Sequence, residues 1–248
     1  MKLTTLEFED AIMQTVKRVC FDKPSLKAMY EQKYVTREGA RVVAMEHCAF
    51  ANRYPSWFGN IIANCPHLDV RAYMIENMYV EEVKDPSIEA GHYGSLVDFT
   101  VALGVPEDEV RAYPGDIYTI VAMHYWDNVS RTKPWLEAFA AIPSQELYKA
   151  DRIRKKFGQP SVDAKRWAPL GLKGKAMDHW TAADDADLPE DGHGEATLKI
   201  LLKYADTEDK QQAVLHSLEE TLRVKMFRDE LIGHRAFEAS GIPIPATR

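Results

Sequence analysis

The sequence predicts an all-α protein, because three patterns agree. Apolar residues recur at helical spacing, as in the series Val70, Tyr73, Met74 and Met78, with polar residues between them. The alternation of apolar and polar residues that marks a half-buried strand is nowhere sustained. Clusters of proline, glycine and small polar residues divide the chain into pieces of helical length. These clusters are residues 66–69, 85–87, 104–106, 113–115, 142–144, 157–160 and 188–189.

The first predicted helices lie between these breaks. Residues 42–54 and 70–82 carry apolar stripes at helical spacing. The turn at residues 85–87 folds the chain back toward the preceding helix, and His92 then opens another helix. The apolar face of that helix contains Leu96, Phe99 and Leu103.

Later elements are predicted from their ends. The acidic residues 107–109, after Pro106, and 208–209, after Thr207, are typical of a first helical turn, where carboxylates stabilise the free backbone N–H groups. The second group starts a long helix over residues 210–236. Segment 158–174 is rich in proline, glycine and charge, and it is predicted as a loop over the bundle.

Composition indicates one domain spanning residues 1–248, since a chain of 248 residues with 46% hydrophobic residues can bury one large core. A formal net charge of -7 argues against a nucleic-acid partner. No stretch approaches the roughly 20 apolar residues of a membrane span. The first ten residues lack the pattern of a secretory signal, so we expect a cytoplasmic protein. Cys20, Cys48 and Cys65 are widely spaced and indicate neither a disulfide framework nor a thiolate zinc site.

Acids and histidines spread along the chain are the candidate functional residues. Glutamate and histidine supply the oxygen and nitrogen ligands that iron prefers, and helical bundles build such sites on facing helices. Asn77 and Glu81 extend the apolar stripe of the 70–82 helix, whereas Glu82 is turned about a hundred degrees away. We therefore favour Glu81 over Glu82 as a ligand, and Glu89 competes with His92 on the next helix. The full set of candidate metal ligands is Glu81, Glu82, His92, Glu146, His179, Asp187 and His193.

Five stretches of the chain, in order, resemble the PqqC/CADD-like branch of the haem-oxygenase-like superfamily. Together they cover roughly residues 25 to 235, and no single one is a strict signature. They are residues 50–66, residues 71–82, the helix from His92 to Gly104, residues 140–147, and a late His-Gly followed by residues 203–212.

The resemblance implies a compact bundle of about seven helices, a homodimer and an oxygen-using enzyme. In the diiron branch of this superfamily, two Fe(II) ions per chain activate O2 to oxidise a small-molecule substrate, mostly an amino acid, its derivative or a fatty acid. The outcomes include N-oxygenation, desaturation and C–C cleavage. Carried over by position, Glu81 or Glu82 is the first carboxylate ligand, His92 the first histidine and Glu146 the middle glutamate.

The late ligands fit the resemblance less well, because the family spaces His, Asp and His by about four and three residues on one helix. Here Ala183 follows His179 at the first spacing, so either a loop is inserted or one ligand is lost. We choose His179, Asp187 and His193, because residue 187 lies nearer the helical face of residue 179 than residue 184 does. Glu190 could replace the aspartate, which would leave His179 outside the site.

Three other functions compete with a diiron oxidase. A cofactorless PqqC-like oxidase would have a site lined by His, Tyr, Arg and Lys. A TenA-like hydrolase would need a nucleophilic cysteine in the middle of the chain, but all three cysteines precede residue 66. A non-catalytic helical interaction protein would carry the acids as surface charge. A haem enzyme is disfavoured, because His47 is the earliest histidine and lies beyond the first helix.

Overall fold

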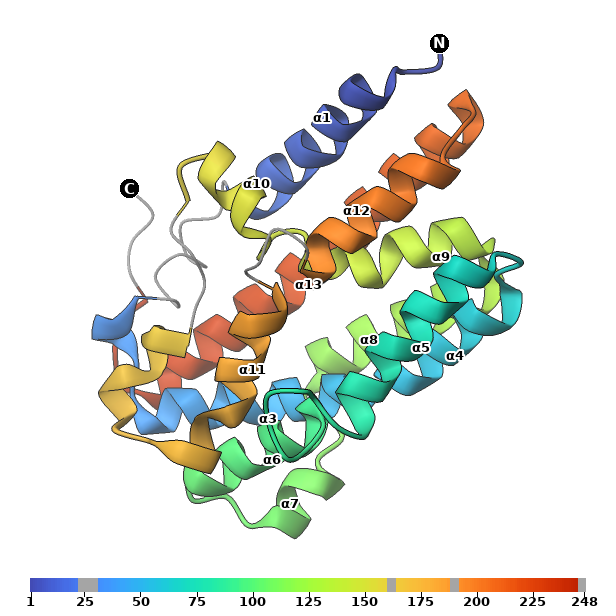
Figure 1. Ribbon diagram of the computed structural model, residues 1–248. Helices are drawn as coiled ribbons and strands as arrows, with labels where there is room; N and C mark the ends of the chain where they lie inside the picture. The colour runs from blue at the N-terminus through green and yellow to red at the C-terminus, as the bar shows by residue number, and fades with distance from the viewer. Residues whose placement is uncertain (22–30, 160–163, 188–191, 245–248) are drawn as a thin grey trace.

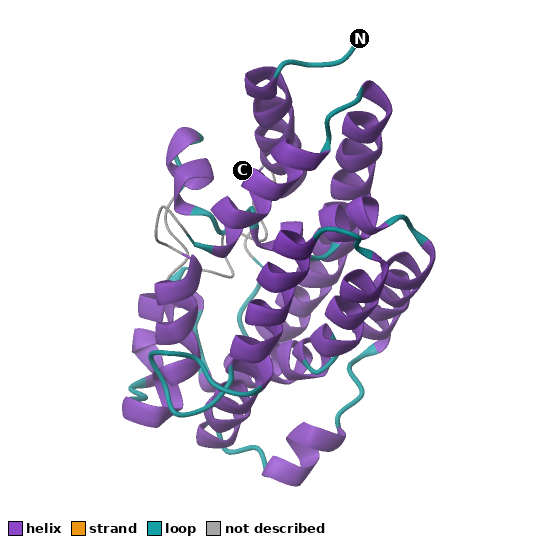
Figure 2. Ribbon diagram, turned by 45° about the vertical axis from the view of Figure 1, so that its right-hand side comes forward, coloured by secondary structure: helices purple, strands orange, loops and turns teal. Residues whose placement is uncertain are grey.

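The computed structural model describes residues 1–21, 31–159, 164–187 and 192–244, without the side chains of residues 32 and 185–187. Within these ranges all regular structure is helical, so the predicted all-α class is confirmed (Figure 2). The described α-helices are α1 (Thr5–Val16), α3 (Arg37–Ala51), α4 (Tyr54–Asn64), α5 (Leu68–Glu82), α6 (His92–Ala102), α7 (Glu107–Ala112), α8 (Ile117–Thr132), α9 (Trp135–Ala141), α10 (Asp151–Lys156), α11 (Asp178–Asp187), α12 (His193–Tyr204) and α13 (Glu208–Ala239).

The described ranges contain twelve α-helices, more than the seven expected, because prolines and glycines divide the chain into more and shorter helices. Pro134, for example, divides α8 from α9. A short π-helix, Lys17–Phe21, continues α1. Short 3-10 helices span Gln32–Tyr34, Pro143–Glu146, Ala164–Leu170 and Gly174–Met177. None of the described helices combines the length and apolar character that a membrane span requires.

Several predicted helix ends are confirmed. His92 opens α6, and Pro106 is the N-cap of the short helix α7 with three acids in its first turn. The side chain of Thr207 caps α13 by accepting a hydrogen bond from the backbone N–H of Lys210. The loop predicted for residues 158–174 is wrong in part: Ala164–Leu170 forms a 3-10 helix, because Trp167 buries its ring against the core.

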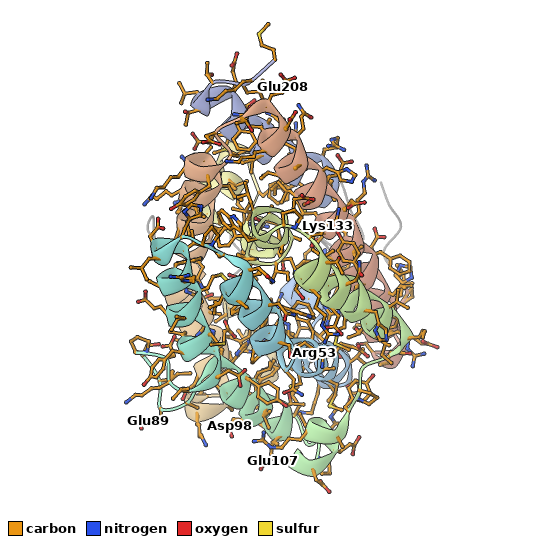
Figure 3. All side chains as sticks on the ribbon, turned by 90° about the vertical axis from the view of Figure 1, so that its right-hand side faces the viewer. Arg53, Glu89, Asp98, Glu107, Lys133 and Glu208 are labelled. Carbon is orange, nitrogen blue, oxygen red and sulfur yellow. The ribbon has the colours of Figure 1, made fainter. Side chains whose placement is uncertain are left out.

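Helix α13 is the long axis around which the others pack (Figure 1). It contacts α1, α3, α8 and α9 along its length. Helices α1 and α12 lie side by side at one end, and α4 packs between α5 and α8. Charged residues such as Glu107, Lys133 and Glu208 lie around the outside of the bundle (Figure 3).

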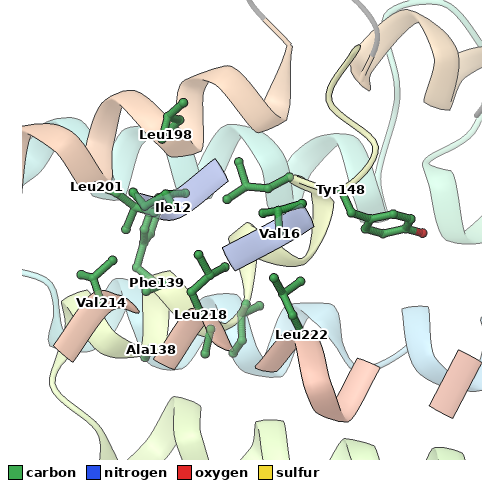
Figure 4. Packing of buried hydrophobic residues seen from close by; sticks show 14 of the residues in the cluster. Ile12, Val16, Ala138, Phe139, Tyr148, Leu198, Leu201, Val214, Leu218 and Leu222 are labelled. Carbon is green, nitrogen blue, oxygen red and sulfur yellow. The ribbon is translucent and has the colours of Figure 1, made fainter. Parts of the chain in front are cut away.

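The larger of two buried clusters fills the space between α1, α9, α12 and α13. Ile12 and Val16 from α1 meet Phe139 of α9, while α12 and α13 supply leucines on either side (Figure 4). A second cluster lies between α3 and α6, around Phe99 and Leu96. The region between these clusters is where polar side chains gather.

A buried hydrogen-bond chain ties α8, α9 and α13 together. Trp126 Nε1 donates to Thr221 Oγ1 at 2.7 Å, and that hydroxyl donates to the Ala141 carbonyl at 2.6 Å. Thr221 and Trp126 are both fully buried. The Trp126 indole N–H, the Thr221 hydroxyl and the Ala141 carbonyl are thereby all paired.

Replacing Thr221 by valine should lower the free energy of unfolding by ~1–3 kcal/mol, because it leaves a buried indole N–H and a buried carbonyl without partners. Urea unfolding followed by circular dichroism measures the change. The control is Thr132→Val, whose exposed hydroxyl donates to the Asn128 carbonyl in α8, and it should change stability by less than ~0.5 kcal/mol. Equal, small losses in the two variants would contradict the assignment.

Candidate functional site

The candidate site is a cavity of about 110 Å³ in the middle of the bundle, bounded by α3, α5, α6, α11, α12, α13 and the 3-10 turn Pro143–Glu146. One water needs only ~10–15 Å³ on this measure, so there is room for a small organic molecule. Aromatic and titratable side chains dominate the lining. Its chemically active members are His47, Tyr54, Glu81, His92, Gln145, Glu146, Lys149, Arg166, His179, Trp180, Asp184, His193, Lys225, Arg228 and Asp229.

One side of the cavity is built by the end of α5, the following turn and the start of α6. His92 Nδ1 lies 3.1 Å from Glu81 Oε1, and His92 Nε2 lies 2.9 Å from Asp85 Oδ2. Burial alone would lower the pKa of His92, but the hydrogen bonds and charges of Glu81 and Asp85 outweigh it and raise the pKa to about 9. His92 is therefore an imidazolium ion held between two carboxylates.

Two further histidines lie next to His92 and stay neutral. His179 Nδ1 donates to the His92 carbonyl at 3.0 Å, which leaves its Nε2 as a lone-pair acceptor. Burial, helped by the nearby charge of His92, lowers the pKa of His179 to about 3. Burial also lowers the pKa of His47, whose ring centroid lies 5.6 Å from that of His179.

Glu146 and His193 line the cavity close to Glu81. His193 Nδ1 is 3.7 Å from Glu146 Oε2, and the Tyr73 hydroxyl donates to the His193 carbonyl at 3.1 Å. Glu81, Glu146 and His193 also line a small adjoining pocket together with Tyr54. Burial, followed by the charges of Glu146 and Glu81, raises the pKa of Tyr54, so its phenol stays protonated.

Four cationic side chains line the same cavity. Lys225 and Arg228 are both paired with Asp229 on α13, at 2.9 and 3.1 Å. The Arg166 guanidinium lies over the rings of Trp167 and Trp180, at 4.4 and 4.9 Å from their centroids. The fourth cation is Lys149.

The structure brings five of the seven predicted ligands to this cavity. They are Glu81, His92, Glu146, His179 and His193. Glu82 is exposed on the outer side of α5, which agrees with the preference for Glu81. The side chain of Asp187 lies outside the described residues. Glu89 is exposed in the turn before α6 and points away from the bundle (Figure 3).

The late histidines belong to two helices rather than one. His179 is in α11, and His193 is the first residue of α12. They still reach the same cavity, because both helices contact each other and α12 contacts the 3-10 turn that carries Glu146. The helical-face argument compared Asp184 and Asp187 with His179, and all three lie in α11. Asp184, which that argument ranked second, lines the cavity.

Sequence reasoning missed His47, Gln145, Trp180 and the Lys225–Arg228–Asp229 group. Only the last of these left a signal, since charged residues interrupt the apolar stripe of α13 near Leu222. A buried charge needs a partner, so this interruption marks a functional or structural group. His47 and Gln145 have no distinguishing context in the sequence.

No protein-family model and no curated protein matches the chain. Solved structures do match it. A domain of unknown function with a heme oxygenase-like fold, from Shewanella denitrificans, aligns with a TM-score of 0.69 and 12% identity over 100% of both chains. The chain has a haem-oxygenase-like fold. A TenA homologue from Pseudomonas syringae pv. tomato aligns with a TM-score of 0.65 and 12% identity, over 94% of this chain and 92% of that chain.

The expected haem-oxygenase-like fold is thus confirmed, and at 12% identity the likeness extends to the fold alone. The PqqC/CADD-like branch stays a prediction. Cys20, Cys48 and Cys65 are buried and free, and none of them is among the residues that line the central cavity.

Iron, which the diiron branch would require, is compatible with the donor types of this haem-oxygenase-like cavity. Glu81, Glu146 and His193 surround one region of it, and the free Nε2 of His179 faces a second histidine. Among the described residues, no three His, Cys, Asp or Glu side chains converge tightly enough to form a ready-made metal site. Ligation by His92 would require the imidazolium to lose its proton and one of its ring nitrogens to exchange a carboxylate partner for iron.

Proposed function

We propose that this protein is a non-haem diiron oxidase that uses O2 to oxidise a small metabolite, an amino acid or its derivative. The observation that supports this is the meeting of Glu81, Glu146, His179 and His193, from four separate elements, in one cavity. Carboxylate and imidazole groups are the ligands that iron takes in carboxylate-bridged helical bundles. Bound Fe(II) would supply the electrons that make O2 reactive.

The residues that line the cavity would have two roles: some would bind iron, and others would shield the substrate. Glu81, Glu146 and His193 would hold iron at one end of the cavity, with His179 and His92 as further ligands. His179 is held in one orientation by its hydrogen bond to the His92 carbonyl, as metal-binding histidines commonly are. The rings of Phe50, Tyr54 and Trp180 keep bulk water away from the substrate.

Anaerobic reconstitution with Fe(II) tests the proposal. We expect about two iron ions per chain, and an absorbance change when the loaded protein is mixed with O2 and candidate amino acids. Glu146→Ala and His193→Ala should abolish iron binding, because each removes a ligand. Glu82→Ala and His216→Ala are the matched controls, since both side chains are exposed outside the cavity, and they should bind iron normally.

A folded protein that takes up no iron would overturn this proposal and favour a cofactorless oxidase. The observation that favours that second function is the set of Lys149, Arg166 and neutral histidines lining the same cavity. Such groups suit an anionic substrate that reacts with O2 directly. Substrate-dependent O2 consumption by iron-free protein would then distinguish it from a non-catalytic helical protein.

A further inference from the structure

Gln145 is a buried side chain whose amide has no partner. It lies in the 3-10 turn Pro143–Glu146, is 1% exposed, and lines the central cavity. Neither Nε2 nor Oε1 forms a hydrogen bond with any described residue. Buried primary amides are nearly always hydrogen-bonded, because burial without a partner costs free energy. Among the described residues, the NH₂ group of Gln145 therefore has no acceptor to donate to, and its carbonyl oxygen has no donor to accept from.

Trp180 presents a second buried polar atom of this kind among the residues that line the cavity. Its indole N–H has no acceptor among the described residues, and its side chain also lines the cavity. The ring is fixed on several sides: its centroid lies 4.7 Å from that of His179 and 5.0 Å from that of Trp167. A fixed donor is suited to recognising an acceptor on a bound molecule, because little side-chain entropy is lost on binding.

We propose that Gln145 and Trp180 are substrate-binding residues that select an uncharged group carrying a hydrogen-bond donor beside an acceptor, of which a carboxamide is the simplest. Gln145 offers one donor group and one acceptor, and Trp180 offers a donor only. A carboxamide oxygen accepts from Gln145 Nε2 or Trp180 Nε1, and its NH₂ group donates to Gln145 Oε1. A carboxylate has no hydrogen to donate and would leave Gln145 Oε1 unpaired. The inference rests on the proposed function in one respect: the central cavity is the substrate site.

Isothermal titration of iron-free protein with benzamide and with benzoate tests the proposal. The two probes have the same shape, and an aromatic ring suits the rings of Phe50 and Tyr54 in the cavity wall. Wild-type protein should bind benzamide more tightly than benzoate. Gln145→Met should weaken benzamide binding about tenfold, the effect of losing about one to two hydrogen bonds. Trp180→Phe should weaken it to a smaller extent.

A stability measurement separates binding from structural support. Gln145→Met should leave the melting temperature unchanged or raise it, since the amide has no hydrogen bond to lose with the part of the chain that the structure describes. The matched control is Gln211→Met, because the Gln211 amide is paired with both the N–H and the carbonyl of Leu3; that variant should melt at lower temperature.

Three outcomes would overturn the proposal: no benzamide binding by folded wild-type protein, equal or tighter binding of benzoate, or equal benzamide binding by Gln145→Met. Because no iron is present in this experiment, failure here leaves iron uptake untouched. Failure of iron uptake equally leaves the carboxamide preference standing.

Discussion

Replacing Asp229 by asparagine should lower the free energy of unfolding by ~3–5 kcal/mol, the range for breaking a buried ion pair. Asp229 is 5% exposed and lies between buried Arg228 and Lys225, whose side chain is 11% exposed. Its Oδ2 pairs with Lys225 at 2.9 Å and its Oδ1 with Arg228 at 3.1 Å. Asparagine keeps the shape of the side chain but leaves two buried positive charges facing each other without compensation. Urea unfolding at neutral pH measures the loss.

A second substitution identifies charge as the cause. Adding Lys225→Met to Asp229→Asn removes one of the two cations, so the double variant should recover part of the lost stability. Arg228 remains held by its hydrogen bonds to Thr119 Oγ1 and the Glu46 carbonyl, at 3.0 and 2.7 Å. A double variant less stable than Asp229→Asn would show that packing, not charge, determines the effect.

The control for this series lies on the same helix. Glu238 pairs with Arg235 at 3.1 Å, but both side chains are more than half exposed. Glu238→Gln should therefore change stability by less than ~1 kcal/mol. If Glu238→Gln lowered the free energy of unfolding as much as Asp229→Asn does, burial could not be the reason for the large effect at Asp229.

The helices of this fold were predictable where local chemistry determines them. Helix α13 was expected over residues 210–236 and spans Glu208–Ala239, because its acidic first turn and Thr207 cap are local signals. Helix α6 begins at the predicted His92 for a similar reason, after a proline-containing turn. The 3-10 helix Ala164–Leu170 was not predictable, since its formation depends on burial of Trp167 against distant residues.

Residues of the site were predictable only in part, for a related physical reason. Glu81 continues an apolar stripe, so its burial follows from helical geometry alone. The pairing of His92 with Asp85 depends on how the intervening turn closes, and the meeting of His179 with His47 depends on packing between α11 and α3. Gln145 became a candidate only once its burial and its lack of partners were known. Long-range packing supplies these facts, and no local pattern encodes them.

The close approach of α5 and α6 gives the second large expected effect: Gly91→Ala should be strongly destabilising and should disrupt the cavity wall. A Cβ at position 91 would lie 2.7 Å from the Glu81 carbonyl oxygen, 2.7 Å from the Glu82 carbonyl carbon and 2.9 Å from the Val83 nitrogen. All three are main-chain atoms, so no side-chain rotation can relieve the contact. The backbone of Gly91 has φ -71° and ψ 168°, which alanine adopts readily. The destabilisation would therefore come from these main-chain contacts and not from backbone strain.

We expect Gly91→Ala to lower the free energy of unfolding by ~1–3 kcal/mol or more, the usual cost of overpacking. Relief requires the start of α6 to move away from the end of α5, which separates His92 from Glu81. Denaturant unfolding measures the first effect, and the NMR signals of the His92 ring report the second. Gly94→Ala is the matched control in α6, because its Cβ would meet only the Ala90 Cβ, at an ordinary 3.5 Å. That variant should gain ~0.5–1 kcal/mol from the higher helix propensity of alanine. If the two alanine variants were equally stable, the contact between α5 and α6 could not be what holds Glu81 against His92.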